Sequence, residues 1–597
     1  MQAKKEPFDR KNKALALMEV AQGERPADLI VRNGKLLNVF TREIYQADVA
    51  VFGGRFAAVG DLSHHKASRE IDATGMYILP GFVEPHIHVE VSKLSVTRFA
   101  ELVLPHGTTA VVTGFDQIGA VAGLKGIRSF LDEAKATHLK VFLGVPSKLP
   151  YTTPPSTIGS GLGPSEHAEA QRWEESVGTW ETTSDFVLMG DEDVLRAMDM
   201  AFENRLLPHG HCPLLTGDKL QAYLTTGIRS DHESLSKEEA LQKLRSGVYV
   251  MIRETPLAPN LEQDIKLITE NGVDPRRICL CTDDTTVTAL AENGHLDNLA
   301  RKAVQHGVSP VDVVQMITIN PAEAYRIDHL VGSVSAGRIA DLVVVEDLSG
   351  FRVKKVVASG QLVAEDGSML LKYSPPERPP WLLNTMRLRE IKAEELALRS
   401  PFSSDAVRAI SIYVDQDNDF YRFRREVKLK VEDGVVLADP SQDVLYVSAV
   451  ERYSGQGMPK TAFISGFHLR RGAMATTLTP DDDNVICVGA DLRDMAFAIN
   501  HLTRMGGGHV VVDGLSVKAE LALPIGGICT DARPEEVKDK EKRLKEAAWE
   551  LGSDLREPFM AMAFLPITAI PQYAITDKGL VDCSSKRVIS PLLGPAD

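Results

Sequence analysis

The chain has 597 residues, of which 44% are hydrophobic and 25% charged, and its formal net charge is −15 at pH 7. This composition is ordinary for a globular enzyme, and the length allows several domain-sized units. The acidic balance argues against nucleic acids and anionic membranes as partners, because phosphate binding needs clustered Lys and Arg. No apolar run approaches the roughly 18–20 residues that span a bilayer.

The N-terminus and the cysteines predict a cytoplasmic location. The first 25 residues mix charges throughout and lack the apolar centre of a signal peptide. The six cysteines are scattered and include no Cys-x-x-Cys pair, which argues against both a disulfide framework and a Cys-type zinc site. We therefore expect a reducing compartment.

Two separated segments have the character of one small antiparallel sheet. Residues 1–27 read as an N-terminal extension with a short helix over 12–22. From Asp28, short apolar runs alternate with hairpin signals such as Asn33-Gly34 and Gly53-Gly54. The same pattern returns near 337–345. Residues 28–80 and 331–370 are therefore expected to form one discontinuous β-sandwich domain.

The segment between them, residues 81–330, alternates strand-like and helical patterns. Short continuous apolar runs are typical of buried parallel strands, and strand–helix units repeated over about 250 residues predict a (β/α)8 barrel. One such strand is expected at 186–188. Residues 371–400 read as a linker, and 401–597 as a C-terminal α+β domain. The predicted fold class is α/β.

A His-x-His pair stands at the start of the predicted barrel. His86 and His88 follow the Pro80-Gly81 turn in a strand-like run. Side chains at i and i+2 of a strand point the same way, roughly 7 Å apart, so both imidazoles can reach one metal ion. Taken alone, the pair is better explained as two partly exposed strand histidines.

Further ligand types recur where later strands of the barrel are predicted to end, which is where such barrels place functional groups. Each has an alternative interpretation. His211 is favoured over His209, which reads as a loop histidine; Glu181 also fits a solvated loop. Asp283 and Asp284 also fit caps of the next helix. The set of candidate ligands is His86, His88, Glu181, His211, His232 and Asp283.

Several motifs resemble the amidohydrolase superfamily and, within it, the adenine deaminase family. They cover the chain from about Asp28 to its end. The matching stretches are Pro80 to Glu90, Gly210 to Pro213, Ser230 to Glu233, Tyr249 to Glu254, Leu280 to Asp284, Asn320 to Ala324, Gly337 to Leu342, Gly472 to Met474 and Leu523 to Gly527.

The resemblance implies two divalent metal ions of the iron or manganese type, and the ligand types also suit zinc. His86 and His88 would bind one ion and His211 and His232 the other. Glu181 would bridge the ions, and Asp283 would ligate and accept a proton. Such ions lower the pKa of bound water from about 15.7 towards 7.

The implied reaction is hydrolytic deamination of adenine to hypoxanthine and ammonia, in purine salvage, by a hydroxide that the two ions share. Asp283 or Asp284 would pass its proton to the departing amine. Glu233 or Glu90 would protonate the ring nitrogen beside the reacting carbon; Glu233 also fits an acid at a helix start. The implied partner is a purine base, and the family suggests a homo-oligomer.

One stretch departs from the family pattern. The family's C-terminal domain carries a His-Asp-Ser-His-Asn run where this chain has Pro480, Asp481, Asp482, Asp483 and Asn484. Another aminopurine is therefore an open alternative to adenine. The acidic run also fits a solvated turn.

Two other functions remain open on the sequence. A cyclic-amide hydrolase of the hydantoinase type would place a carbamylated lysine between the ions, with Lys148 as the candidate. A non-catalytic scaffold would keep the barrel without the ions.

Overall fold

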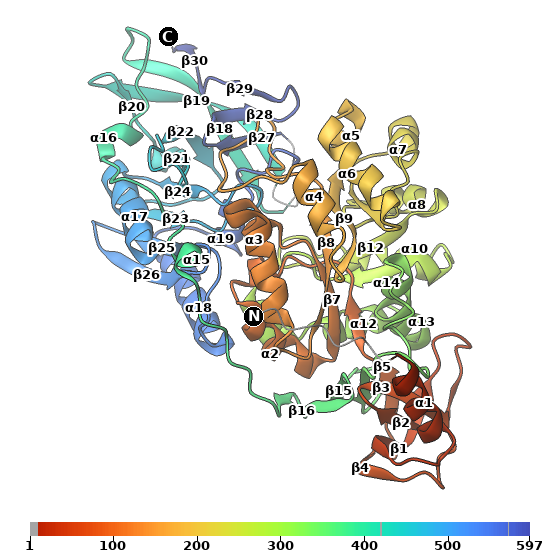
Figure 1. The fold of residues 1–597 in the computed structure, drawn as a ribbon. Coiled ribbons are helices and arrows are strands. Elements are labelled where there is room, and N and C mark those ends of the chain that lie inside the picture. Colours follow the sequence, from red (N-terminus) through yellow and green to blue (C-terminus); the bar gives the residue numbers. More distant parts are fainter. Residues whose placement is uncertain (1–9, 418–420, 571, 597) are drawn as a thin grey trace.

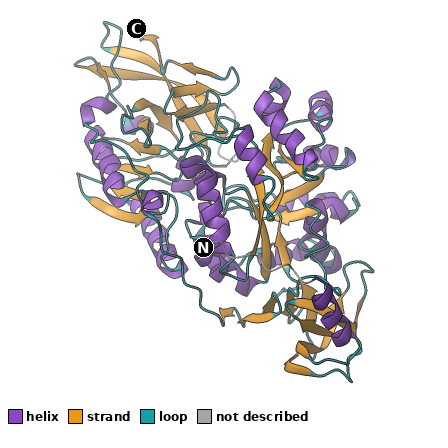
Figure 2. Cartoon of the chain, in the orientation of Figure 1, coloured by secondary structure: helices purple, strands orange, loops and turns teal. Residues whose placement is uncertain are grey.

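The computed structural model describes residues 10–417, 421–570 and 572–596. A small sheet, a barrel and a C-terminal domain follow one another across the molecule (Figure 1). Figure 2 shows that helices surround the barrel strands, whereas the small sheet carries little helix. None of the helices in the described ranges is both long and apolar enough to span a bilayer.

The small sheet joins strands from both sides of the barrel segment. Its central pairing sets β5 antiparallel to β14, with Leu79 opposite Val343. The two ends of the barrel segment are therefore held next to each other. The short helix α1 (Arg10–Ala21) precedes the sheet. The strands are β1 (Ala27–Leu37), β2 (Ile44–Phe52), β3 (Arg55–Gly60), β4 (Ala67–Asp72), β5 (Tyr77–Pro80), β14 (Leu342–Val345), β15 (Val353–Ala358), β16 (Gln361–Glu365) and β17 (Ser368–Met369).

The barrel consists of parallel strands that follow one another in chain order. They are β6 (Phe82–Glu84), β7 (Thr108–Thr113), β8 (Lys140–Pro146), β9 (Ser176–Thr183), β10 (Leu207–His211), β11 (Ser230–Asp231), β12 (Tyr249–Arg253) and β13 (Ile278–Cys281). The amide of Asp283 donates to the carbonyl of His86 over 3.0 Å, which joins the last strand to the first. The predicted TIM-like barrel is confirmed.

Helices cover the outside of this barrel. They are α2 (Val96–Val103), α3 (Asp116–Ala134), α4 (Pro164–Ala170), α5 (Ser184–Met189), α6 (Glu192–Glu203), α7 (Gly217–Leu224), α8 (Lys237–Arg245), α9 (Leu261–Asp264), α10 (Lys266–Thr269), α11 (Val287–Asn293), α12 (Leu296–Gln305), α13 (Pro310–Met316) and α14 (Ile319–Ala324).

The strand predicted at 186–188 is wrong, because these residues lie in helix α5. A three-residue apolar run cannot distinguish a strand from a buried helix turn. Phe186 and Val187 are buried while Leu188 is exposed, as one helix face requires. The actual strand is β9, whose residues are all buried although many are Thr, Gly or Glu. Glu181 therefore lies within a strand, and its interpretation as a solvated loop residue is also wrong.

The C-terminal domain is built on a mixed sheet with helices α17 (Leu492–Met505) and α18 (Pro534–Glu550). Asp491 caps α17 with its side chain, and Gly506 ends it with φ +80°, which suits glycine. The sheet strands are β18 (Ala406–Asp415), β19 (Tyr421–Glu432), β20 (Val435–Val436), β21 (Leu445–Val450), β22 (Lys460–Ser465), β23 (Ala473–Thr476), β24 (Val485–Gly489), β25 (Gly508–Val512), β26 (Val517–Ala522) and β30 (Leu592–Pro595).

A smaller sheet and a short helix complete this domain: β27 (Tyr573–Thr576), β28 (Gly579–Asp582), β29 (Arg587–Ile589) and α19 (Pro558–Ala563). The linker segment 371–400 carries the single turns α15 (Pro380–Leu383) and α16 (Ala393–Leu396). Buried side chains of α2, α3 and α18 belong to one continuous apolar cluster, so the C-terminal domain packs directly on the barrel.

Candidate metal centre and substrate cavity

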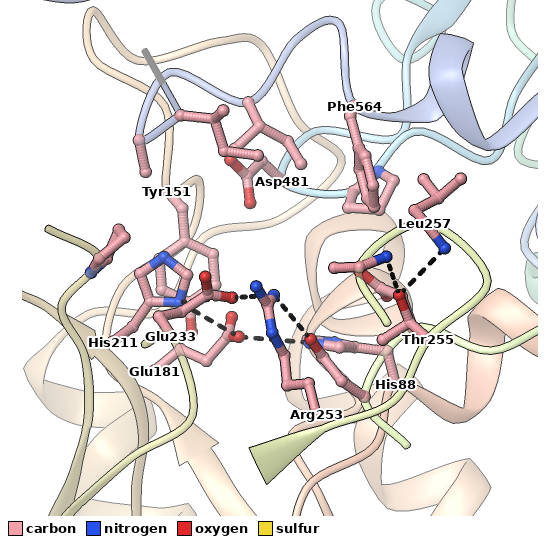
Figure 3. Close-up of a pocket in the computed structure, with 18 of the residues that line it drawn as sticks. His88, Tyr151, Glu181, His211, Glu233, Arg253, Thr255, Leu257, Asp481 and Phe564 are labelled. Atoms are coloured by element: carbon pink, nitrogen blue, oxygen red, sulfur yellow. Dashed lines mark hydrogen bonds and ion pairs between the residues drawn. The ribbon is translucent and has the colours of Figure 1, made fainter. Parts of the chain in front are cut away.

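The six predicted metal ligands meet at the carboxyl ends of the barrel strands. His86 and His88 follow β6, Glu181 lies near the end of β9, and His211 ends β10. His232 follows β11, and Asp283 follows β13. All six are buried or nearly so. Side chains up to 197 residues apart in sequence therefore share one site, of which Figure 3 shows His88, Glu181 and His211.

The Glu181 carboxylate lies at the centre of the histidines. Its Oε1 is 3.5 Å from Nε2 of His86, 3.2 Å from Nε2 of His88, 3.7 Å from Nδ1 of His211 and 3.4 Å from Nε2 of His232. Burial alone would raise the pKa of this carboxyl, but the imidazoles, His88 first, hold it well below its ordinary value. One oxygen thus faces both histidine pairs.

Asp283 also lies at this centre. Its Oδ1 is 3.4 Å from Nε2 of His86 and 3.5 Å from Nε2 of His88. Glu181 and Asp283 also share an unusual backbone, with φ of +41° and +49°. Non-glycine residues avoid this left-handed region, and such strain is concentrated at functional sites.

Neighbouring side chains fix the orientation of the first two imidazoles. The indole of Trp180 stacks on His86, with ring centroids 4.1 Å apart and planes within 5°. Asp116 Oδ1 lies 3.2 Å from Nδ1 of His88. A carboxylate on one ring nitrogen sets the tautomer and leaves the other nitrogen free to bind a cation.

A buried lysine organises the second histidine pair. Lys243 is fully buried, and its Nζ lies 2.7 Å from Asp231 and 2.6 Å from Glu239. Asp231 in turn accepts the backbone N–H of Cys212 over 2.8 Å. Asp231 precedes His232 and Cys212 follows His211, so this network ties together the backbones that carry both ligands.

The donor set fits metal ions. His86 Nε2, His211 Nδ1 and His232 Nε2 are buried and have no hydrogen-bond partner within the described ranges. Buried polar atoms seldom stay unpaired, and imidazole nitrogens with carboxylate oxygens are ligands of first-row divalent ions. Two compact ligand groups share Glu181: one adds His86 and His88, the other His211 and His232.

Two further acids, Glu233 and Asp284, lie beside this centre and differ in their charge surroundings. Glu233 lies 2.6 Å from Arg253, which also contacts Asp283 over 3.2 Å. Burial would raise the pKa of Glu233, but Arg253 and the histidines lower it to about 2. Asp284 lines the cavity, and its burial together with the charge of Asp283 raises its pKa to about 7.

Glu90 is placed differently from what the sequence suggested. It is fully buried in the turn after His88, where its Oε1 accepts the amide of Ile118 over 3.3 Å. Burial and the Asp116 carboxylate raise its pKa to about 8. The described residues that line the cavity do not include Glu90, so its reach to a substrate is not supported.

The alternative helix interpretations of the acids are wrong. Helix α8 is capped by Ser236, which leaves Glu233 outside its first turn. Helix α11 is capped by the side chain of Thr286, so neither Asp283 nor Asp284 caps it.

Two rival site residues lie away from the centre. The ammonium of Lys148 pairs with Asp191 at the start of α6, and Lys148 is outside the described cavity lining. The hydantoinase-type carbamylated lysine is therefore not supported. His209 has its Nδ1 2.8 Å from the Ser230 hydroxyl, and its ring stacks on Tyr325 at 4.0 Å. It is buried within strand β10, so its interpretation as a loop histidine is wrong, and it is not among the described residues grouped around Glu181.

A cavity lies over the metal centre, and the C-terminal domain covers it. Pro480, Asp481, Tyr421, Phe564 and Ile567 line it from that domain. Figure 3 shows Asp481 and Phe564 facing Glu233 and Arg253 across the cavity. Asp482 and Asp483 are fully buried. The interpretation of this acidic run as a solvated turn is wrong.

Sequence reasoning assigned no role to Asp116, Tyr151, Arg253 and Phe564, which also line the cavity. Arg253 ends β12, so the strand-end rule that found the other residues would have included it. Asp116 begins α3, three residues after β7. Phe564 carries no comparable signal, because its position depends on domain packing.

Comparisons with known proteins show the family to which the chain belongs. The family model described as "Amidohydrolase family" matches residues 77–363, and the "Adenine deaminase C-terminal domain" model matches 421–587. Adenine deaminase 4 of Rhizobium meliloti is 48% identical over 96% of both chains. The chain belongs to the adenine deaminase family. The predicted resemblance is thus confirmed.

Other members of the adenine deaminase family match over nearly their whole length. Adenine deaminase 1 of Desulfotalea psychrophila is 44% identical over 97% of both chains. Adenine deaminase 1 of Latilactobacillus sakei is 42% identical over 98% of this chain and 99% of its own. Among solved structures, the β-aspartyl dipeptidase of Fervidobacterium islandicum AW-1 aligns with 58% of this chain and 98% of its own, at 17% identity and a TM-score of 0.44.

Proposed function

We propose that this protein hydrolyses adenine to hypoxanthine and ammonia. The observation that carries the proposal is the position of Glu181, whose Oε1 lies within 3.7 Å of a nitrogen of each of four histidines. Full-length relatives named adenine deaminase support the choice of substrate. No observation favours a cyclic amide.

His86 and His88 would hold one divalent ion and His211 and His232 another, of the iron or manganese type, with Glu181 shared and Asp283 beside them. When bound, these ions supply a hydroxide nucleophile at neutral pH. In the overall reaction, water adds to C6 of the purine and the bond from C6 to the amino nitrogen breaks. The two protons of the water end on the ring nitrogen N1 and on the leaving amine.

Asp283 and Glu233 suit these two proton transfers. The Asp283 carboxylate faces the ligand nitrogens and would pass a proton to the amine. Asp284 lies beside it in the cavity and is the alternative base. Glu233 is paired with Arg253 in the resting site, so the proton it gives to N1 would come from the water. Arg253 contacts the carboxylates of Glu233 and Asp283 and would keep their positions fixed relative to each other.

The test is ammonia release from adenine, with hypoxanthine identified as the product, by protein loaded with Fe²⁺ or Mn²⁺. We expect Glu181→Gln to lower the metal content per chain and to reduce kcat by more than about 100-fold, because ligands and their supports control metal affinity. Lys148→Met is the control, and it should retain both metal and activity. A metal-loaded wild-type protein that released no ammonia from adenine would refute the proposal.

A further inference from the structure

The loop between β23 and β24, residues 477–484, reaches over the substrate cavity and is firmly held. Arg452, fully buried, donates from its Nε to the carbonyl of Asp483. The hydroxyl of Tyr453 donates to the carbonyl of Asp482 over 2.7 Å. Asn484 donates from its side chain to the carbonyl of Thr157 in the barrel over 2.9 Å. The loop therefore has a fixed position relative to the barrel.

The three aspartates of this loop have different surroundings. Asp482 accepts the amide of Asn484 over 3.1 Å, and Asp483 accepts the amide of Thr479 over 3.3 Å. Each of the three has a buried Oδ2 without a hydrogen-bond partner among the described residues, but Asp481 alone of them lines the cavity. Its φ of +83° places the backbone in the left-handed region. An unpaired buried carboxylate oxygen is costly and calls for a partner.

The surroundings of Asp481 define what this partner must offer. Figure 3 shows the carboxylate directed into the cavity between Tyr151 and Phe564, opposite Glu181 and Glu233. A carboxyl oxygen that carries no proton accepts hydrogen bonds, whether the group is ionised or neutral. Such an oxygen suits a donor on the part of the substrate that faces the C-terminal domain, opposite Glu181 and Glu233.

Adenine has one such donor. With C6 directed at the metal centre, the five-membered ring lies at the far end, and its only donor is the ring N–H. We propose that Asp481 is the specificity-determining residue that accepts this N–H, which selects the free base over bases substituted at that nitrogen, such as nucleosides. This inference rests on the proposed deamination and specifies how adenine is oriented in the cavity.

The expected discrimination is large. A site built to accept a hydrogen bond from a substrate N–H rejects analogues that lack it by about 10⁴–10⁵-fold, because the buried acceptor is left unpaired. Wild-type protein should therefore favour adenine over 9-methyladenine by at least about 10³-fold in kcat/KM.

Two substitutions test Asp481 without disturbing the loop. Glycine and asparagine both tolerate φ of +83°, so Asp481→Gly and Asp481→Asn keep the backbone. We expect Asp481→Gly to raise KM for adenine about 10–100-fold and to leave 9-methyladenine turnover unchanged or improved, because the buried ring N–H of adenine loses its acceptor. Asp481→Asn retains a carbonyl acceptor, so its KM for adenine should lie between those of the wild type and Asp481→Gly. Asp482→Asn, which changes the neighbouring charge outside the cavity lining, is the matched control.

The inference is overturned if Asp481→Gly lowers turnover of both substrates equally, or if it leaves KM for adenine unchanged. Calorimetric titration of the metal-loaded proteins with hypoxanthine gives a second measurement that needs no turnover. Hypoxanthine keeps the ring N–H, so Asp481→Gly should weaken its binding by the same factor. If the wild type deaminates no aminopurine, the proposed function fails, whereas this titration still decides the role of Asp481.

Discussion

At the residue scale, the site depends on buried ion pairs. Lys243 is the clearest case, because its fully buried ammonium meets the carboxylates of Asp231 and Glu239. Breaking a buried pair leaves an uncompensated charge, which costs far more than the loss of a surface pair. The same network holds the backbones beside His211 and His232, so stability and metal binding are coupled here.

We expect Lys243→Met to lower the free energy of unfolding by about 3–5 kcal/mol and to weaken metal binding about 10–100-fold. Urea unfolding and metal content after dialysis measure the two effects. Lys237→Met on the same helix is the control, since its pair with Glu270 is partly exposed and should be worth less than about 1 kcal/mol. Equal effects of the two substitutions would contradict this role for the network.

At the element scale, the four histidine ligands were predictable from the sequence, whereas strand β9 was not. The ligands His86, His88, His211 and His232 were found because they follow recognisable apolar runs, and the structure brings them together. β9 was missed because its buried face uses Thr, Gly and Trp instead of an aliphatic run. Burial of such residues is decided by neighbouring strands, which no local pattern reveals. The cavity roof was missed for the same reason, since Phe564 is placed by domain packing.

The start of β9 is fixed to helix α3 by an ion cluster. Glu175 lies 2.8 Å from Arg128 and 2.7 Å from Lys135. Burial would raise the pKa of Glu175, but these cations lower it to about 2, against an ordinary value of 4.5. A carboxyl with a lowered folded-state pKa stabilises the fold above its unfolded-state pKa, and this contribution is lost as the pH falls towards 2.

Glu175→Gln should therefore lower the free energy of unfolding by about 1–3 kcal/mol at pH 7, a range that allows for the half-exposed Lys135. The difference from wild type should shrink steadily below pH 4.5. Urea unfolding at pH 7, 5 and 3.5 gives the comparison. Asp132→Asn serves as the control, because this exposed acid contacts the same Arg128 and should show little effect at any pH. A Glu175→Gln difference that did not change with pH would contradict the assignment.

At the scale of the whole molecule, the cavity exists only where the barrel and the C-terminal domain meet. The metal-binding side chains come from the barrel, whereas Asp481 and Phe564 come from the other domain. The two parts share an apolar cluster that includes α2 and α18. They are also joined by a buried ion pair, in which Lys93 Nζ lies 2.6 Å from Glu541. The interface is thus part of the site as well as of the fold.

Because Lys93 and Glu541 are both about 95% buried, Lys93→Met should cost about 3–5 kcal/mol by leaving Glu541 unpaired between the domains. The double substitution Lys93→Met with Glu541→Gln should recover part of this loss, since the unpaired charge is gone. Glutamine also keeps an acceptor for Thr288, whose hydroxyl lies 2.6 Å from Glu541. Lys540→Met, which removes an exposed pair with Glu536 on the same helix, should cost less than about 1 kcal/mol. Urea unfolding followed by fluorescence measures all three, and a double variant less stable than Lys93→Met alone would show that the pair does not act as a unit.

Since the roof of the cavity is held by this interface, Lys93→Met should also raise KM for adenine while leaving the metal content unchanged.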